Sequence, residues 1–145
     1  MKNVRTLITI CLLLTAFSAV TAIAQTPGDR LVTVNVPFAF SAGDQALPAG
    51  AYTIYSTAFG RMIQIMSDDR KHTAFVRALP NFGINESAAT TLTFHKYGSE
   101  FFLARISTQG ESLTREVLVS KRAIELARTE AKPQTVLVAA LHNGR

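Results

Sequence analysis

Cysteine is almost absent from this sequence of 145 residues, and tryptophan is absent altogether. The only cysteine, Cys11, lies in an apolar stretch near the N-terminus. The rest of the chain therefore has no residue for a disulfide, a thiol nucleophile, a cysteine-ligated zinc site or an iron–sulfur cluster. Charged residues make up 17% and hydrophobic residues 48% of the chain, a balance that argues against intrinsic disorder.

The first residues have the three parts of a secretory signal peptide. Lys2 and Arg5 give a cationic start, Leu7–Val20 is free of charge, and Ala22-Ile23-Ala24 has the small residues of a cleavage site. A membrane anchor is the alternative, but as a helix the apolar run is only about 21 Å long. The hydrocarbon core of a bilayer is roughly 30 Å thick. The pattern therefore predicts a cleavable signal peptide over residues 1–24.

Cleavage after Ala24 leaves residues 25–145, whose length fits a single β-rich domain. Such a protein is exported, to the periplasm or to the outside of the cell, and does not span the membrane after cleavage. Loss of Lys2 and Arg5 lowers the formal net charge from +5 to +3. That mild excess does not indicate nucleic acid as a partner.

The mature sequence alternates apolar and polar residues with a period of two, which is typical of half-buried strands. The expected strands are 31–40, 51–56, 61–66, 72–77, 90–97, 100–107, 113–119 and 135–141. Pro37 cannot donate to a strand ladder, so the first of them is either an edge strand or broken there. Ser41–Asp44 and Leu47–Gly50 have turn composition, and Gly98-Ser99 fits a two-residue hairpin turn.

One helix is expected, over residues 120–131, before Lys132-Pro133 ends it. Ser120 is placed to cap its N-terminus, and Lys121 and Glu125 are spaced as a helical ion pair. The apolar positions with helical spacing are Ala123, Ile124, Ala127 and Ala131. The predicted fold is mainly β: an antiparallel β-sandwich or small barrel of about seven or eight strands with one helix on the C-terminal side.

Four sequence blocks come in a recognisable order. They are Val36–Phe40 (VPFAF), Leu47–Tyr52 (LPAGAY), Leu92–Gly98 (LTFHKYG) with Phe101–Leu103, and Ser120-Lys121 with Glu125–Ala127. Together they resemble a family of small secreted β-rich proteins of unknown function from acidobacteria, over residues 31–131. The resemblance implies a secreted β fold and carries no activity or catalytic residue.

This chain departs from the family's pattern at three positions. It has Lys96 where the family often has Arg, and Phe101 where the family often has Tyr. It also has Ala123 where a Glu tends to follow the capping serine. The last change removes a capping box, so it bears on the stability of the helix and not on function.

His95, Lys96 and Tyr97 lie next to each other just before the predicted hairpin turn. One interpretation is a polar cluster that binds an anion or shuttles a proton. The alternation favours another, in which Leu92 and Phe94 face the core while His95 points outward with Tyr97 as an ordinary surface residue. An enzyme built here would pair His95 with an acid such as Glu100.

Other chemistry has little support in the sequence. The histidines have no metal-binding spacing, and Asp68-Asp69 lacks that of a calcium loop, so neither a metal nor a cofactor is expected. No serine lies in a nucleophile-elbow motif and no glycine-rich loop is present. The basic residues of the C-terminal half are interpreted as a solvated face: Arg115, Lys121, Arg122, Arg128 and Lys132.

The segment Ala78–Ala89 is predicted as a long loop with two apolar residues, Phe82 and Ile84. Such loops are frequent binding elements, and Phe59 in a nearby turn is a further candidate. The alternative is that Phe82 folds back and plugs one end of the core. Two functions follow from these observations: a non-catalytic envelope or extracellular module that binds a protein or a glycan or has a structural role, and a small hydrolase or isomerase at His95. The sequence specifies no oligomeric state.

Overall fold

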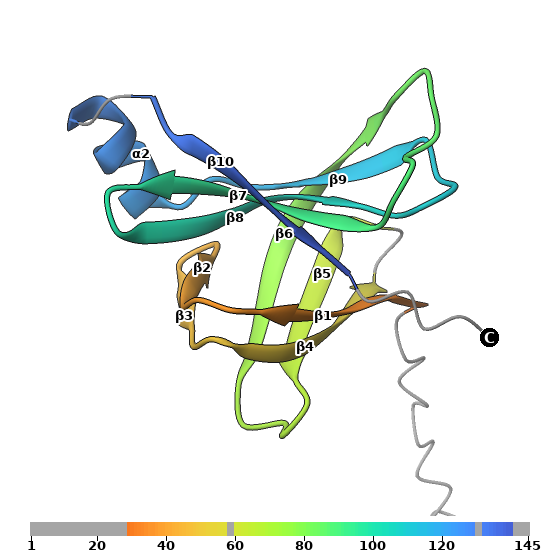
Figure 1. The fold of residues 1–145 in the computed structure, drawn as a ribbon, viewed down its shortest axis with the longest axis horizontal. Helices are drawn as coiled ribbons and strands as arrows, with labels where there is room; N and C mark the ends of the chain where they lie inside the picture. Colours follow the sequence, from red (N-terminus) through yellow and green to blue (C-terminus); the bar gives the residue numbers. More distant parts are fainter. Residues whose placement is uncertain (1–28, 58–59, 130–131, 141–145) are drawn as a thin grey trace, which may run out of the picture.

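The computed structural model describes residues 29–57, 60–129 and 132–140, and shows one hydrogen-bonded sheet of ten strands with one helix (Figure 1). The predicted signal peptide lies outside these residues. The strands are β1 (Asp29–Val36), β2 (Phe40–Ala42), β3 (Gln45–Leu47), β4 (Gly50–Thr57), β5 (Met62–Ser67), β6 (Thr73–Phe82), β7 (Thr91–Tyr97), β8 (Glu100–Ser107), β9 (Leu113–Val117) and β10 (Gln134–Ala139). The helix is α2 (Lys121–Thr129). No helix of the described ranges has the length and apolar character needed to cross a lipid bilayer.

The long strand β6 joins two halves of the sheet. Its first part pairs with β5 in a half that continues through β4 to β1, and its second part pairs with β9 in a half that continues through β8 to β7 and β10. The short β2–β3 hairpin joins the second half through a parallel contact between Ser41 and Phe102. The two halves face each other across the core (Figure 1).

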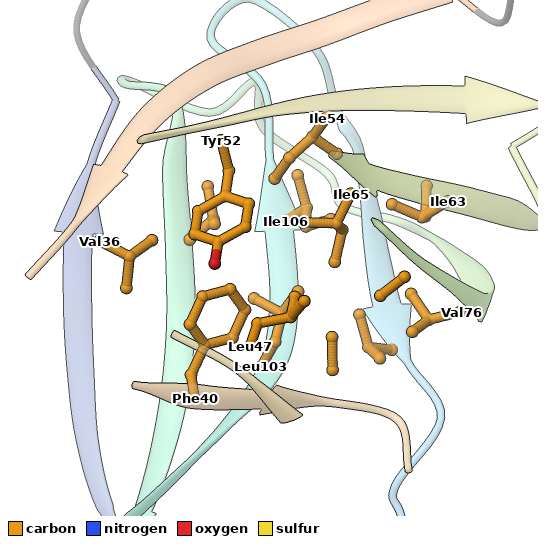
Figure 2. Close-up of a cluster of buried hydrophobic side chains, with 14 of the residues drawn as sticks. Val36, Phe40, Leu47, Tyr52, Ile54, Ile63, Ile65, Val76, Leu103 and Ile106 are labelled. Carbon is orange, nitrogen blue, oxygen red and sulfur yellow. The ribbon is translucent and has the colours of Figure 1, made fainter. Parts of the chain in front are cut away.

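The predicted alternation holds in most strands because every second side chain enters this core. In β4 and β5 the buried hydrophobic residues are Tyr52, Ile54, Ile63 and Ile65, which meet residues of β8 such as Ile106 (Figure 2). The Tyr52 hydroxyl donates a 2.6 Å hydrogen bond to the Pro48 carbonyl. Burial, aided by the charge of Asp69, raises the pKa of Tyr52, so this phenol stays protonated.

An aromatic group ties the β2 region to β7 and β8. Phe38 stacks on Phe101 with ring centroids 3.9 Å apart, and meets Phe94 edge to face at 5.2 Å. Phe40 contacts Phe94 and Tyr52 in the same edge-to-face manner. Such pairs favour one fixed arrangement beyond the simple burial of their area.

The predicted strand 31–40 is in fact two strands. β1 ends at Val36 and β2 begins at Phe40, because Pro37 interrupts the ladder. Of the two alternatives, an edge strand or a break at Pro37, the structure shows the break. The following segment, Ser41–Asp44, is not wholly a turn. Only Gly43-Asp44 turns the chain, with Gly43 at φ 58°, and β3 follows. These short strands explain why ten strands form where seven or eight were expected.

The predicted loop 78–89 is wrong over its first five residues, because β6 continues to Phe82 despite Pro80. The Ala78 N–H donates to Arg61 on the β5 side, and the Gly83 N–H donates to Ser112 on the β9 side. By alternation the Pro80 nitrogen points to the β5 side, where pairing with β5 has already ended. Its missing N–H therefore costs no ladder hydrogen bond.

Helix α2 begins as predicted. The Ser120 hydroxyl accepts a 3.1 Å hydrogen bond from the Ala123 N–H, which is the N-cap interaction. The ion pairs at the helix differ from the expected Lys121–Glu125 pair: Arg122 pairs with Glu100 at 2.8 Å and with Glu125 at 3.9 Å. The last expected strand is confirmed as β10, while Ala131 and Leu141 lie outside the described residues.

Candidate ligand-binding cleft

Helix α2 lies against the outer face of the second half of the sheet (Figure 1). A small second core forms there from Tyr97 and Phe102 on the sheet and Ala123 and Leu126 on the helix. The Tyr97 and Phe102 rings meet edge to face at 6.0 Å. Tyr97 was expected on the solvent side with His95. That expectation is wrong, because α2 covers the end of this face and buries Tyr97.

Beside this small core the helix and the sheet enclose a cleft of about 650 Å³. Its apolar lining comes mainly from the chain that enters α2 and from the helix itself, at Leu118, Val119, Ile124 and Ala127. Val119 is 65% exposed and Ile124 is 42% exposed. The volume lies within the range of small-molecule sites, and exposed aliphatic side chains at a concave surface are typical of them.

Polar groups lie around this apolar lining. His95 and Thr135 line it from β7 and β10, and Arg105 and Glu116 line it from β8 and β9. Arg105 Nη2 lies 2.9 Å from Glu116 Oε1, so these two charges neutralise each other. Arg128 approaches from the last turn of α2, and no carboxylate of the described residues lies within ion-pair distance of it. The cleft therefore carries a net positive charge at its helix side.

The structure separates Lys96 from the other two members of the predicted His95–Lys96–Tyr97 cluster. His95 and Tyr97 both line the cleft, and the buried Tyr97 also packs against α2. Lys96 lies on the opposite face of β7, where its Nζ is 5.4 Å from the centre of the Phe101 ring. Successive strand residues point to opposite faces, which separates Lys96 from both neighbours.

The acid expected to work with His95 is engaged elsewhere. Glu100 accepts hydrogen bonds from Arg122 at 2.8 and 3.4 Å, and these bonds lower the pKa of Glu100. Within the described residues, no hydrogen bond or ion pair joins His95 to Glu100. A catalytic general acid near neutral pH needs a raised pKa, so the Arg122 contact acts in the opposite direction.

The apolar residues of the predicted binding loop, Phe82 and Ile84, do not line the cleft. Phe82, at the end of β6, is 74% exposed, and Ile84 in the following loop is fully exposed. Phe82 therefore does not plug the core. Phe59, the third residue of that prediction, lies outside the described residues.

The Asp68-Asp69 loop has a structural explanation. Asp69 accepts hydrogen bonds from the Ser67 hydroxyl at 2.6 Å and from the Lys71 N–H at 3.1 Å. These bonds close the β5–β6 turn, in which Arg70 has φ 59°, and they lower the pKa of Asp69. Across the described ranges no three histidine, cysteine or acidic side chains lie close enough together to hold a metal ion.

Comparison with protein-family models, with curated proteins and with solved structures found no match to this chain. The cleft therefore has to be interpreted from its own residues.

The sequence interpretation missed the residues that shape the cleft. Leu118 and Val119 were counted as the end of a strand, but β9 ends at Val117 and they form the passage into α2. Ile124 was expected on the buried face of the helix, and it lies instead at the cleft. An apolar pair next to a helix-capping serine was the available signal, because a strand that ends there leaves the pair at a junction.

Proposed function

We propose that this protein is an exported, non-catalytic β module that binds a small amphipathic ligand in the cleft between α2 and the outer face of β7–β9. The observation that carries the proposal is the cleft itself, which is mainly apolar and has a few polar groups around it. That combination is the usual composition of a small-molecule site. Export rests on the signal-peptide pattern and on the resemblance to a secreted acidobacterial family.

The chemistry of the lining favours a ligand with an apolar body and one anionic group. Leu118, Val119 and Ile124 offer aliphatic surface, and Arg128 offers a positive charge at one side. A sugar ring would need an exposed aromatic face, but the aromatic side chains at the cleft, Tyr97 and Phe102, are buried. A lipid-like or aromatic acid fits this lining better than a glycan.

A second candidate is a protein or glycan surface at the end of β6. The exposure of Phe82 and Ile84 favours it, because exposed large apolar side chains mark interaction sites when they form a patch. It ranks below the cleft because these side chains project from a strand end and its loop.

Absence of catalysis is proposed because, in the part of the chain that the structure describes, no hydrogen bond or ion pair joins His95 to a carboxylate. Its expected partner Glu100 is bound to Arg122 with a lowered pKa. We also propose that the continuous sheet, bent around one core, is best described as a partly open barrel, with β1 and β10 near each other.

Anilinonaphthalene sulfonate is a suitable first probe, because it joins an apolar ring system to one negative charge. Titration of the purified protein should give a saturable rise in dye fluorescence. Ile124→Gln removes aliphatic surface from the cleft and should weaken dye binding by about tenfold, the effect of about 1.4 kcal/mol. The matched control is Phe75→Gln, which removes an exposed apolar side chain elsewhere on the sheet.

Binding unchanged by Phe75→Gln and weakened by Ile124→Gln supports the cleft. Equal weakening by both variants, or none by either, contradicts it. Loss of binding in Phe82→Ala with Ile124→Gln unaffected would move the site to the end of β6 and establish the second candidate. Thermal unfolding of each variant without dye checks that the folded state is retained.

A further inference from the structure

Arg115 is the only buried charged residue within the described part of the chain. It lies on β9 opposite Ile106 of β8 and Pro80 of β6, and its side chain is only 8% exposed. The sequence interpretation of Arg115 as part of a solvated basic face is therefore wrong. A buried guanidinium is normally paired and fully hydrogen-bonded, because removing a charged group from water costs free energy that these contacts must offset.

The hydrogen bonds of Arg115 are incomplete. Its Nη1 donates to Glu111 Oε2 at 3.1 Å and has a long 3.5 Å contact with Thr108 Oγ1. Its Nε is buried and has no hydrogen-bond partner. Nη2 also has no partner among the described residues. One edge of the guanidinium, made by Nε and Nη2, thus lacks an acceptor, although the other nitrogen is engaged.

A cavity of about 460 Å³ lies beside this group. The start of β1 contributes Asp29 and Arg30, and the loop between β8 and β9 contributes Thr108 and Glu111. The other lining residues are Ser56 at the end of β4, Gly60 in the β4–β5 turn and Leu113 at the start of β9. Gly60 lies next to Nε: a Cβ at Gly60 would lie 3.9 Å from that nitrogen, at van der Waals contact. The cavity shares no lining residue with the α2 cleft.

We propose that this cavity is a second ligand site, which binds a carboxylate group through the Nε–Nη2 edge of Arg115. These two nitrogens present parallel N–H groups whose spacing matches the two oxygens of a carboxylate. Such a ligand supplies the hydrogen-bond acceptor that the described residues do not provide. The site stands independently of the α2 cleft.

The charges around the cavity decide between anions. Arg30 and Arg115 are positive, and Asp29 and Glu111 are negative, so the lining is balanced before a ligand enters. A singly charged carboxylate adds one negative charge next to a buried arginine. A doubly charged phosphate is disfavoured because both acidic side chains lie in the same lining. The carboxylate belongs either to a small free acid or to the C-terminus of a peptide.

The direct test follows the Arg115 Nε–H signal by NMR in the whole protein during titration with acetate. We expect a saturable downfield shift of this proton, because it gains an acceptor. Inorganic phosphate should bind at least about tenfold more weakly than acetate. Absence of any acetate-dependent shift, or phosphate binding as tight as acetate, overturns the proposal.

A pair of short peptides distinguishes the two sources of the carboxylate. If a peptide with a free C-terminus binds more tightly than acetate and its amidated form does not bind, the ligand is a chain terminus. If acetate and the free peptide bind equally, the ligand is a small acid. Equal binding of the free and amidated peptides contradicts recognition of a carboxylate.

Substitutions provide an independent check. Arg115→Met should abolish the acetate effect, whereas Arg77→Met, at an exposed position of β6, should leave it unchanged. Glu111→Gln should tighten acetate binding by about threefold to tenfold, because it removes a neighbouring negative charge. If Arg115→Met fails to fold, Glu111→Gln still tests the proposal. Glu111 is half-exposed, so its substitution should leave the fold intact. Weaker acetate binding in Glu111→Gln overturns the proposal.

Discussion

The two halves of the sheet differ in how many of their faces are covered. Within the described residues no helix lies over the outer face of β4–β6, and Phe75 on this face is 60% exposed. The outer face of β7–β9 is covered in part by α2, which buries Tyr97 and Phe102. The cleft lies only in the second half. A sheet can be stable when only its inner face is buried. Where α2 covers part of the outer face as well, a concave apolar surface forms at the edge of the helix.

Apolar side chains on the two faces of the second half of the sheet differ in their solvent exposure. Those on the inner face, such as Phe94, are closed off completely and hold the halves together. Those at the edge of the partial cover, such as Val119 and Ile124, stay accessible. Stability should therefore depend on the first kind and ligand binding on the second.

The largest expected effect is on the inner face. Phe94→Ala should lower the free energy of unfolding by about 3–5 kcal/mol, because it removes a fully buried ring and leaves a cavity beside Phe38 and Phe40. Phe75→Ala should change it by less than about 0.5 kcal/mol, because this ring is exposed. Urea denaturation measures both. A similar decrease in the free energy of unfolding of the two variants would contradict the proposed difference between the inner and outer faces.

A smaller effect is expected at the start of the covering helix. Ser120→Ala removes the N-cap of α2 and should cost about 1 kcal/mol of stability. Because the cleft depends on the position of α2, this variant should also bind the anilinonaphthalene dye more weakly. Ser99→Ala, in the exposed β7–β8 turn, is the control and should change neither quantity. A stable Ser120→Ala protein with full dye affinity would show that the cap does not position the helix.

The smallest effect is expected in the uncovered half, at Asp69. Its folded-state pKa is lowered by hydrogen bonds from Ser67 and Lys71, so its contribution to stability is present above the ordinary aspartate pKa of about 3.9. That contribution is lost as the pH falls through the lowered folded-state value. Asp69→Asn should therefore show a weaker fall in stability below about pH 4 than the unchanged protein.

The control for this measurement is the neighbouring Asp68, which accepts only a 3.4 Å hydrogen bond from Thr53. Denaturation of Asp68→Asn over the same pH series should follow the unchanged protein. An identical acid response of Asp69→Asn and the unchanged protein would remove Asp69 as a source of the pH dependence.

Local patterns predicted the parts of the fold that depend on local physics. Leu92 and Phe94 are buried as their alternation requires, and Ser120 caps its helix. Tyr97 follows the same alternation to the outer face and is nevertheless buried, because α2 covers that end of the face. The docking of a later helix on a strand face is a tertiary event that strand periodicity does not contain.

The errors at Pro80 and Arg115 have a common origin. Both residues lie where β6 pairs with β9. Each was interpreted from its residue type, proline as a loop residue and arginine as a surface residue, and not from its position in a strand. Arg115 is two residues before the buried Val117 and thus on the same face of β9. An arginine at an inward strand position was a visible signal of a buried charge. The cavity beside it, however, is built by β1 and the β4–β5 turn, which no spacing in β9 predicts.

The most direct test of a ligand site in the partly covered half is to map dye binding on the backbone. Amide signals of the protein are recorded by NMR with and without anilinonaphthalene sulfonate. We expect the changes to concentrate on α2 and the outer-face residues of β7, β8 and β9, with β4 and β5 unaffected. Changes concentrated on β4 and β5, or on residues 82–84, would contradict it.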